Sequence, residues 1–336
     1  MSSIYVREQG TTVRKHGEKL LVTKEETVLL EVPLLNIDNV AVFGKVQVTT
    51  QALHAFLERG ISVSYFTYYG KYLGHIEGEQ SKNIFLRLKQ YELYEDKTEC
   101  LEVAKKIVSG KIDNQIGVLQ GHRWNVETYN CKQDIKQMKK LQKSLQEKKS
   151  IEELMGIEGI CSKLYFGAYA YMIKGDGIFD GRNRQPPKDP VNAMLSLGYS
   201  FLEKEICSIL NAEGMDCYIG ILHGIRYGRK SLALDLMEEF RQPVIDRLVM
   251  RLWNKRILSA SDFVTSEEDG VVLSEDGFKR FCQEYESWIS GENISSGECS
   301  FRKRMNEQGI LLKKSIMQEA EYQPYCWEER YVHSQL

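Results

Sequence analysis

The segment Ile151–Ile173, IEELMGIEGICSKLYFGAYAYMI, carries the strongest fold signal in the chain. Its apolar residues have the 3.6-residue spacing of a helix and cover nearly the whole circumference, which predicts a buried helix. Glu158 lies between two glycines of this segment. An unpaired buried carboxylate is costly, so Glu158 needs a partner, for which a metal ion, Lys163 or an arginine would serve.

Helical spacing continues on both sides of this segment, from about residue 81 onward. The apolar residues again repeat every three to four positions, and prolines 186, 187 and 190 mark one long loop between two such segments. This pattern predicts a helical domain. The other segments with helical spacing are Asn83–Glu95, Cys100–Ser109, Asp113–Gln120, Asp134–Leu145, Asn192–Leu210, Ser231–Trp253 and Gly277–Ile289.

Residues 1 to about 80 show a different pattern, with short apolar segments separated by turn residues. One helix is predicted among them, over Thr49–Arg59, with Gly60 behind it. We therefore predict an α+β fold, in which a small β-rich N-terminal domain (residues 1–80) is followed by a larger all-α catalytic domain (residues 81–336). The predicted strands are Ile4–Glu8, Thr11–Lys15, Leu20–Thr23, Val28–Val32, Asn39–Phe43 and Ile61–Phe66.

The composition is that of a folded protein without a membrane segment. The 336 residues include 45 Lys and Arg against 47 Asp and Glu, for a net charge of −2. No uncharged apolar run reaches the roughly 18 residues of a transmembrane helix, and the first residues lack the form of a secretory signal. The eight cysteines form no Cys-x-x-Cys pair and are expected to be free thiols. We therefore expect a cytoplasmic protein.

The charges are unevenly distributed. Residues 82–150 contain 15 Lys and Arg against nine Asp and Glu, a net of +6, which leaves −8 for the remainder. The run Lys132–Lys149 supplies seven of these lysines. A solvated helix face is one interpretation of this run, and a surface for backbone phosphates is the other.

His223 differs from the other histidines because acidic residues follow it closely. It stands in a glycine-rich loop ahead of a predicted helix, for which Ser231 is a plausible N-cap. Asp235 and Glu238, three residues apart, share one face of that helix. A loop imidazole beside two carboxylates is a reasonable metal site. A His–Asp hydrogen bond that stabilises the fold, or an exposed acidic helix end, would explain the same residues.

The loop from Phe179 to Ala193 combines three basic residues with a rigid proline turn and then opens a helix. Arginine guanidinium groups such as those of Arg182 and Arg184 suit phosphate binding. A surface loop that caps the helix, with its arginines paired to protein carboxylates, is the alternative.

Four strings, in order, resemble the CRISPR adaptation integrase, the first-numbered of the CRISPR-associated proteins. Their order, spacing and composition agree over about 85 residues, and the division into a β-rich and a helical part extends the likeness to most of the chain. The strings are Gly156-Ile157-Glu158-Gly159 with Tyr165-Phe166, Arg182-x-Arg184-x-Pro186-Pro187 through Ala193, Leu195-Ser196-x-Gly198-Tyr199, and His223-Gly224 through Arg241.

This resemblance implies a metal-dependent DNA endonuclease and integrase that inserts captured DNA fragments into a CRISPR array. It implies Glu158, His223 and Glu238 as catalytic metal ligands, with Asp235 close behind them. The ion would be Mn²⁺ or Mg²⁺, and imidazole favours Mn²⁺. The attacking group would be a DNA 3′-hydroxyl or water, so Tyr165 is interpreted as a packed or DNA-stacking aromatic rather than a nucleophile.

We predict phosphate contacts with double-stranded DNA by Arg184, Arg229 and Arg241, and further by Lys163. The resemblance also implies a homodimer formed through the β-rich domain, and a complex with a small partner, the second-numbered CRISPR-associated protein. Two alternatives stay open at this stage. They are a metal-dependent nuclease of DNA repair and a non-catalytic DNA-binding scaffold.

Overall fold

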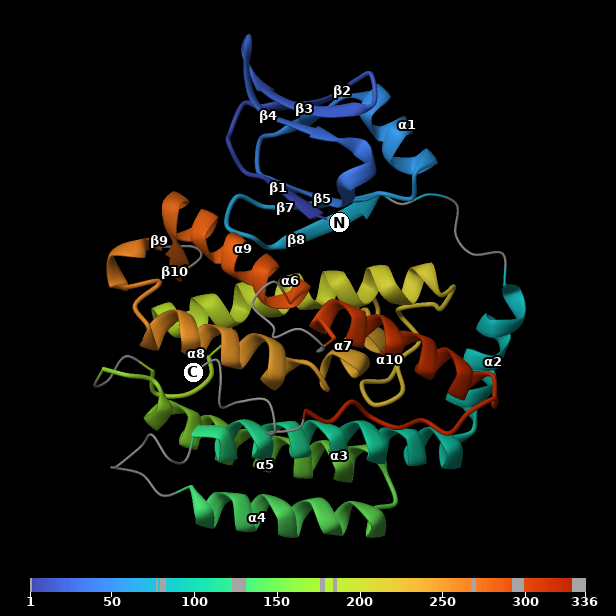
Figure 1. Cartoon of the computed structure of the whole chain (residues 1–336). Helices are drawn as coiled ribbons and strands as arrows, with labels where there is room; N and C mark the ends of the chain where they lie inside the picture. The colour runs from blue at the N-terminus through green and yellow to red at the C-terminus, as the bar shows by residue number, and fades with distance from the viewer. Residues whose placement is uncertain are drawn as a thin grey trace. The chain divides into compact units, whose positions relative to one another are not determined.

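The computed structural model describes residues 2–76, 78, 83–122, 131–175, 179–183, 186–266, 270–291 and 299–327. The chain splits into two compact units, Met1–Gln80 and Ser81–Leu336. Strands dominate the first unit and helices dominate the second (Figure 1). No helix among the described residues is both long enough and apolar enough to cross a membrane. All eight cysteines are free, which confirms the prediction of free thiols.

The first unit contains two four-stranded sheets. In one, of order β1-β5-β7-β8, the first three strands run parallel and the last is antiparallel. In the other, of order β4-β3-β2-β6, β4 lies at an edge. The strands are β1 (Ser2–Val6), β2 (Thr12–His16), β3 (Lys19–Lys24), β4 (Thr27–Pro33), β5 (Ile37–Phe43), β6 (Gln47–Val48), β7 (Ser62–Phe66) and β8 (Tyr72–Ile76).

Helix α1 (Thr50–Glu58) completes this unit. The side chain of Thr49 caps it by accepting a hydrogen bond from the backbone N–H of Ala52 at 3.3 Å. Its buried face contributes Phe56 to a core that both sheets share. The predicted β-rich unit with one helix therefore forms, with the short 3-10 helix η1 (Leu34–Asn36) between β4 and β5.

The second unit is built mainly from helices. Helix α3 lies against both α4 and α5 (Figure 1). The helices are α2 (Ile84–Glu95), α3 (Lys97–His122), α4 (Lys132–Lys143), α5 (Ile151–Met172), α6 (Pro190–Ala212), α7 (Ser231–Met237), α8 (Arg247–Asn254), α9 (Glu275–Ser290) and α10 (Phe301–Ile316), with the short helical segments η2 (Ser144–Glu147), η3 (Arg241–Asp246) and η4 (Ala260–Asp262).

Two helices predicted on either side of Gly110 are in fact one. Helix α3 runs without a break from Lys97 to His122. Gly110 is tolerated inside it because another part of the chain passes close by. A Cβ at this position would lie 2.5 Å from the Cβ of Pro324. The glycine therefore serves packing and does not end the helix.

The predicted helix Ser231–Trp253 is interrupted. Helix α7 ends at Met237, and η3, a π-helical segment over Arg241–Asp246, joins it to α8. Pro243 lies within this segment, and proline cannot donate the backbone hydrogen bond that a regular α-helix requires. Glu238 is the C-cap residue of α7, and its backbone N–H donates to the carbonyl oxygen of Asp235 at 3.2 Å.

The prediction of an all-α second domain is wrong. Strands β9 (Phe263–Ser266) and β10 (Gly270–Leu273) pair in antiparallel register. Both are short segments of apolar and β-branched residues, a composition that favours strands. The backbone N–H of Val271 also donates to the carbonyl oxygen of Pro187 at 2.9 Å, which ties this hairpin to the proline loop.

Candidate metal and DNA site

Glu158 lies on α5, whose faces differ in burial. Leu154 and Ile157 are buried, whereas a Cβ added at Gly156 or Gly159 would meet no heavy atom within 4 Å. The predicted burial of this helix nearly all round is therefore wrong. Only one face packs, and the other leaves Met155 and Ile160 exposed.

The Glu158 carboxylate is partly exposed, with 24% of its side chain accessible. The hydroxyl of Ser162 donates to its Oε1 at 2.8 Å, and the amide of Gln115 donates to that hydroxyl at 3.2 Å. The ammonium of Lys111, on α3, pairs with the same Oε1. The partner of Glu158 is thus Lys111, and not Lys163 or an arginine.

The loop that carries His223 is held by the fully buried carboxylate of Asp235. Its Oδ2 accepts hydrogen bonds from the backbone N–H groups of Ile221 (2.5 Å) and Leu222 (3.1 Å). Its Oδ1 accepts from the backbone N–H of His223 at 3.0 Å. These three bonds satisfy a buried carboxylate and fix the loop on α7.

The same Oδ1 of Asp235 lies 2.6 Å from Nδ1 of His223. A carboxylate only accepts hydrogen bonds, so the proton of this bond resides on Nδ1. In the neutral imidazole, Nε2 then keeps its lone pair for a ligand. The predicted His–Asp hydrogen bond exists, and it is compatible with metal binding because it uses the other ring nitrogen.

The start of α7 differs from the prediction. Lys230 occupies the N-cap position, and no side chain caps the helix there. Instead, the Ser231 hydroxyl accepts a hydrogen bond from Nε of Arg229 at 3.1 Å. A Cβ at Gly220 would lie 2.4 Å from the Cβ of Ser231. Ser231 is thus a packing residue. Because Gly220 has no side chain, the loop can pass close to Ser231.

Glu238 follows α7 and is nearly buried, with 6% of its side chain exposed. Nζ of Lys111 lies 2.5 Å from its Oε2, and Nε of Arg241 donates to its Oε1 at 3.0 Å. Burial alone would raise the pKa of Glu238. Arg241 and Lys111, with a contribution from His223, outweigh burial and lower this pKa to about 2. Glu238 is therefore ionised near neutral pH.

Glu158 and Glu238 share one cation, which is the ammonium of Lys111. Two carboxylates with an imidazole nearby are donors that suit Mn²⁺ or Mg²⁺. The donor set therefore fits a divalent cation at the position of the ammonium. Across the described ranges, no three His, Cys, Asp or Glu side chains already converge as a metal site.

Two of the predicted phosphate contacts are engaged with the protein. The guanidinium of Arg229 donates to the carbonyl oxygen of His223. Arg241 pairs with Glu238, and its guanidinium carbon lies 4.7 Å from the ring centroid of Tyr199. Both arginines therefore stabilise the site from within.

The other two predicted phosphate contacts differ. Lys163 is exposed on α5, and Arg184 lies outside the described residues. In the same loop, Arg182 donates to Oδ1 of Asn192 at 2.9 Å, and Asp189 caps α6 by accepting from the backbone N–H of Asn192 at 2.8 Å. The described part of this loop thus behaves as the capping loop of the alternative interpretation.

A second buried carboxylate, Asp246, lies further along the same elements. The hydroxyls of Tyr165 (2.9 Å) and Tyr199 (2.5 Å) donate to its two carboxylate oxygens. Burial raises the pKa of Asp246 to about 6, against the partial opposition of these two hydrogen bonds. Burial also raises the pKa of Tyr165 well above its ordinary value. Tyr165 is therefore a packed phenol, as predicted, and not a nucleophile.

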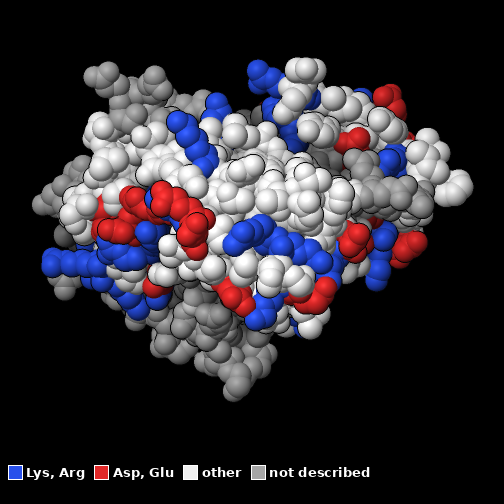
Figure 2. Space-filling view, turned by 90° about the horizontal axis from the view of Figure 1, so that it is seen from above, with Lys and Arg blue, Asp and Glu red and all other residues white. Residues whose placement is uncertain are grey.

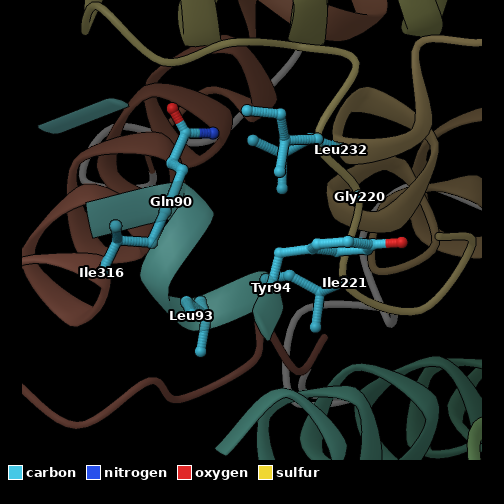
Figure 3. Close-up of a pocket in the computed structure, with 8 residues that line it drawn as sticks. Gln90, Leu93, Tyr94, Gly220, Ile221, Leu232 and Ile316 are labelled. Atoms are coloured by element: carbon cyan, nitrogen blue, oxygen red, sulfur yellow. The ribbon is translucent and has the colours of Figure 1, made fainter. Parts of the chain in front are cut away.

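A small pocket lies behind the His223 loop, between α2, α7 and α10 (Figure 3). Its lining is mostly apolar, and its one amide side chain, that of Gln90, is engaged with Asp216 through a donated bond of 3.1 Å and an accepted bond of 2.9 Å. The pocket thus offers no charged group to DNA. Its lining residues are Gln90, Leu93, Tyr94, Ile219, Gly220, Ile221, Leu232 and Ile316.

Comparisons with known proteins agree with this fold. The family model described as CRISPR associated protein Cas1 matches residues 4–287. "CRISPR-associated endonuclease Cas1 3" of Thermus thermophilus is 32% identical over 330 residues, which covers 96% of each chain. A "CRISPR-associated exonuclease Cas4/endonuclease Cas1 fusion" of Geobacter sulfurreducens is 34% identical over 94% of this chain, which spans 58% of the fusion.

Three solved structures share the fold. A CAS1 protein from Thermotoga maritima matches with a TM-score of 0.83 and 27% identity, over 97% of this chain and 100% of that one. A casposase bound to integration product matches with a TM-score of 0.86 and 23% identity, over 100% and 96%. A Cas6-RT-Cas1–Cas2 complex matches with a TM-score of 0.81 and 24% identity, over 96% and 36%.

The family match and the shared fold thus define a CRISPR-associated protein. The chain belongs to the family of CRISPR associated protein Cas1.

The sequence did not identify Lys111, Gln115 and Ser162 as parts of this site. Ser162 is four residues after Glu158 on α5, a spacing that could have suggested contact. Lys111 and Gln115 come from α3, and no local signal connects that helix to Glu158.

Proposed function

We propose that this chain is a metal-dependent DNA endonuclease and integrase that inserts captured DNA fragments into a CRISPR array. The observation that carries the proposal is the pair Glu158 and Glu238, which come from separate elements and share one cation. The endonuclease names of relatives above 30% identity support the nuclease activity.

Each residue of the site would have a separate role. A Mn²⁺ or Mg²⁺ ion bound by Glu158, Glu238 and Nε2 of His223 would activate the attacking oxygen and stabilise charge on the phosphate. Asp235 holds the proton on Nδ1 of His223, so that the lone pair of Nε2 would be available to a metal ion. Arg241 keeps Glu238 ionised and in place.

The nucleophile in this proposal belongs to the substrate. It is the 3′-hydroxyl of the incoming DNA for joining, and water for cleavage. The attacking oxygen forms a bond to phosphorus while the bond from phosphorus to the leaving 3′-oxygen of the target strand breaks. No protein side chain becomes covalently bound.

The DNA would contact exposed lysines of the helical unit. Ile135 and Met138 face the core on α4, while the exposed lysines of this helix are Lys132, Lys136, Lys139, Lys140 and Lys143. Such a row suits backbone phosphates. On the face drawn in Figure 2, by contrast, basic and acidic side chains of the described residues are interspersed. We therefore place the DNA contacts on α4 and on Lys163.

The proposed assembly is a homodimer formed through the β-rich unit, together with Cas2, in the cytoplasm. Edge strand β4 leaves the apolar residues Val28, Leu29 and Leu30 exposed, and Leu35 is 89% exposed. An exposed apolar edge suits pairing with a second protomer. In the solved complex with Cas2, the Cas1 part has this fold, which supports Cas2 as the partner.

A plasmid-integration assay with Mn²⁺ tests the function. The wild-type protein is compared with Glu158→Ala and His223→Ala, and DNA binding is measured in parallel. Loss of joined products in both variants, with DNA binding retained, is the expected result.

The other outcomes discriminate the alternatives. Joining retained in either variant would exclude the proposed site. Cleavage without joining by the wild type would favour a DNA-repair nuclease. DNA binding without either reaction would favour a non-catalytic scaffold.

A further inference from the structure

We infer that Lys111 is a positioning residue, whose ammonium holds the two carboxylates together until a divalent cation displaces it. The inference rests on the proposed metal-dependent function. It adds a residue and an order of events, in which metal binding is an exchange of one cation for another.

The geometry makes Lys111 the bridge of the site. Its ammonium pairs with Oε1 of Glu158, on α5, and lies 2.5 Å from Oε2 of Glu238. The three side chains are largely shielded, with 8%, 24% and 6% exposed, respectively. Two carboxylates at this separation repel each other unless a cation lies between them. Lys111 supplies that cation from a third element.

The position of Lys111 is set by the packing of α3. Gly110, directly before it, lies against Pro324, and a Cβ there would lie 2.5 Å from the proline Cβ. At Gly117, a Cβ would lie 3.3 Å from the ring of Trp327. The C-terminal segment therefore presses on α3 at both glycines and holds this helix in register with α5.

The structure also contains an acceptor for the displaced ammonium. Gln115 lies four residues after Lys111, on the same face of α3. It is fully buried, and its Oε1 accepts no hydrogen bond from the part of the chain that the structure describes. Its Nε2 is bound to Ser162, which holds Glu158. A Lys111 side chain turned toward this oxygen would therefore satisfy an orphaned buried acceptor.

A matched control, Lys105, lies six residues earlier on the same helix. The side chain of Lys105 is also 8% exposed, and its ammonium lies 2.7 Å from Oε1 of Glu102 and 3.2 Å from the carbonyl oxygen of Gln146. Lys105 thus matches Lys111 in burial and in having an ion pair. It differs because its ion pair is with one carboxylate, that of Glu102, which lies outside the site.

The test is a titration of the full-length protein with Mn²⁺ alone, by calorimetry, and a comparison of melting temperatures in EDTA and in saturating Mn²⁺. Lys111→Met should bind Mn²⁺ at least about tenfold more tightly than the wild type, because a neighbouring opposite charge shifts a carboxylate equilibrium by one to three pK units. Its melting temperature should be lower than that of the wild type in EDTA, and saturating Mn²⁺ should restore most of the difference. Lys105→Met should leave the Mn²⁺ affinity unchanged. Its melting temperature should fall below that of the wild type by the same amount in EDTA and in Mn²⁺.

Wild-type or weaker Mn²⁺ affinity in Lys111→Met would overturn the inference. If that variant does not fold, Lys111→Arg is used, since its two-pronged group should hold both carboxylates and weaken Mn²⁺ binding several-fold; unchanged affinity there would also overturn it. The proposed function fails separately if Glu158→Ala binds Mn²⁺ with the same affinity as the wild type.

Discussion

Two carboxylate centres both involve side chains of α5 and differ in their neighbours. At one, Glu158 on α5 and Glu238 after α7 face the cations of Lys111 and Arg241. At the other, Asp246 at the end of η3 faces two phenols, which include Tyr165 of α5. The pKa of Glu238 falls to about 2, and that of Asp246 rises to about 6.

The difference shows that burial alone does not decide the charge of these groups. Glu238 and Asp246 are both almost inaccessible. Cations in direct contact keep Glu238 ionised, whereas neutral phenols donate hydrogen bonds without balancing the charge of Asp246, and Arg241 and Arg182 attract it without contact. The first centre is suited to exchanging cations. The second ties α5 and α6 to η3.

The largest expected effect is at the cation-balanced centre. Glu158→Gln keeps the shape of the side chain and removes the charge, so the rate of DNA joining in saturating Mn²⁺ should fall about a thousandfold or more. Glu152→Gln, at an exposed position in the first turn of α5, is the control and should join at the wild-type rate. Joining by Glu158→Gln within tenfold of wild type would contradict a ligand role.

The next effect concerns Asp235, which contacts the imidazole and not the shared cation. Asp235→Asn can place an N–H donor toward Nδ1 of His223 and so move the imidazole proton to Nε2. Mn²⁺ affinity, measured by titration, should weaken about a hundredfold. Asp216→Asn, which changes a loop carboxylate that accepts from the backbone N–H of Tyr218 (2.8 Å), should leave it unchanged. Equal affinities in both variants would refute the orienting role.

The phenol-balanced centre should respond to pH instead. The pKa of Asp246 is raised in the folded state from its ordinary 3.8 to about 6, so the folded protein binds this proton more readily than the unfolded chain does. Its contribution to stability is therefore present at low pH and is lost as the pH rises through 6. Between pH 4 and pH 7, this loss is roughly 2 kcal/mol.

Urea unfolding of the wild type and of Asp246→Asn at pH 4, 5.5 and 7 measures this loss. The free energy of unfolding of the wild type, relative to the variant, should decrease over that range. A constant difference would show that Asp246 is ionised throughout, and the two centres would then not differ in charge.

The smallest expected effect concerns Lys163, which is exposed, whereas Lys111 is buried. Lys163→Ala removes an exposed charge next to the site, so DNA affinity should fall a few-fold and the slope of log K against log salt should decrease by about one. Lys71→Ala, at an exposed position in the first unit, is the control and should change neither. A salt slope unchanged by Lys163→Ala would remove Lys163 from the DNA surface.

Much of the architecture could be predicted from periodicity. The alternation of short apolar segments before residue 80 and the helical spacing after it correspond to the strands and helices of the two units. The errors have local causes. Gly110 suggested a helix end but accommodates Pro324, and the β-branched residues of β9 and β10 were too few to stand out among helical segments.

The site could be predicted only in part. Glu158 stood out because it lies between two glycines, and His223 because it lies in a glycine-rich loop. Glu238 stood out because it follows that loop on one helix face with Asp235. The helical spacing of Asp235 and Glu238 placed both on one face, and the resemblance ranked Glu238 as the ligand with Asp235 close behind it. In the structure, α7 ends between them, and Asp235 turns to the His223 loop while Glu238 turns to Lys111.

The sequence by itself determined the two-part organisation and the acidic and imidazole groups of the site, because periodicity and residue chemistry are local properties. The tertiary structure alone decided the charge balance of those groups. Lys111 resembles many other lysines until α3 packs against α5, because the pairing of charges depends on distances between elements far apart in the chain. The same packing gave Asp246 its phenols, and so separated a centre balanced by cations from one held by hydroxyl groups.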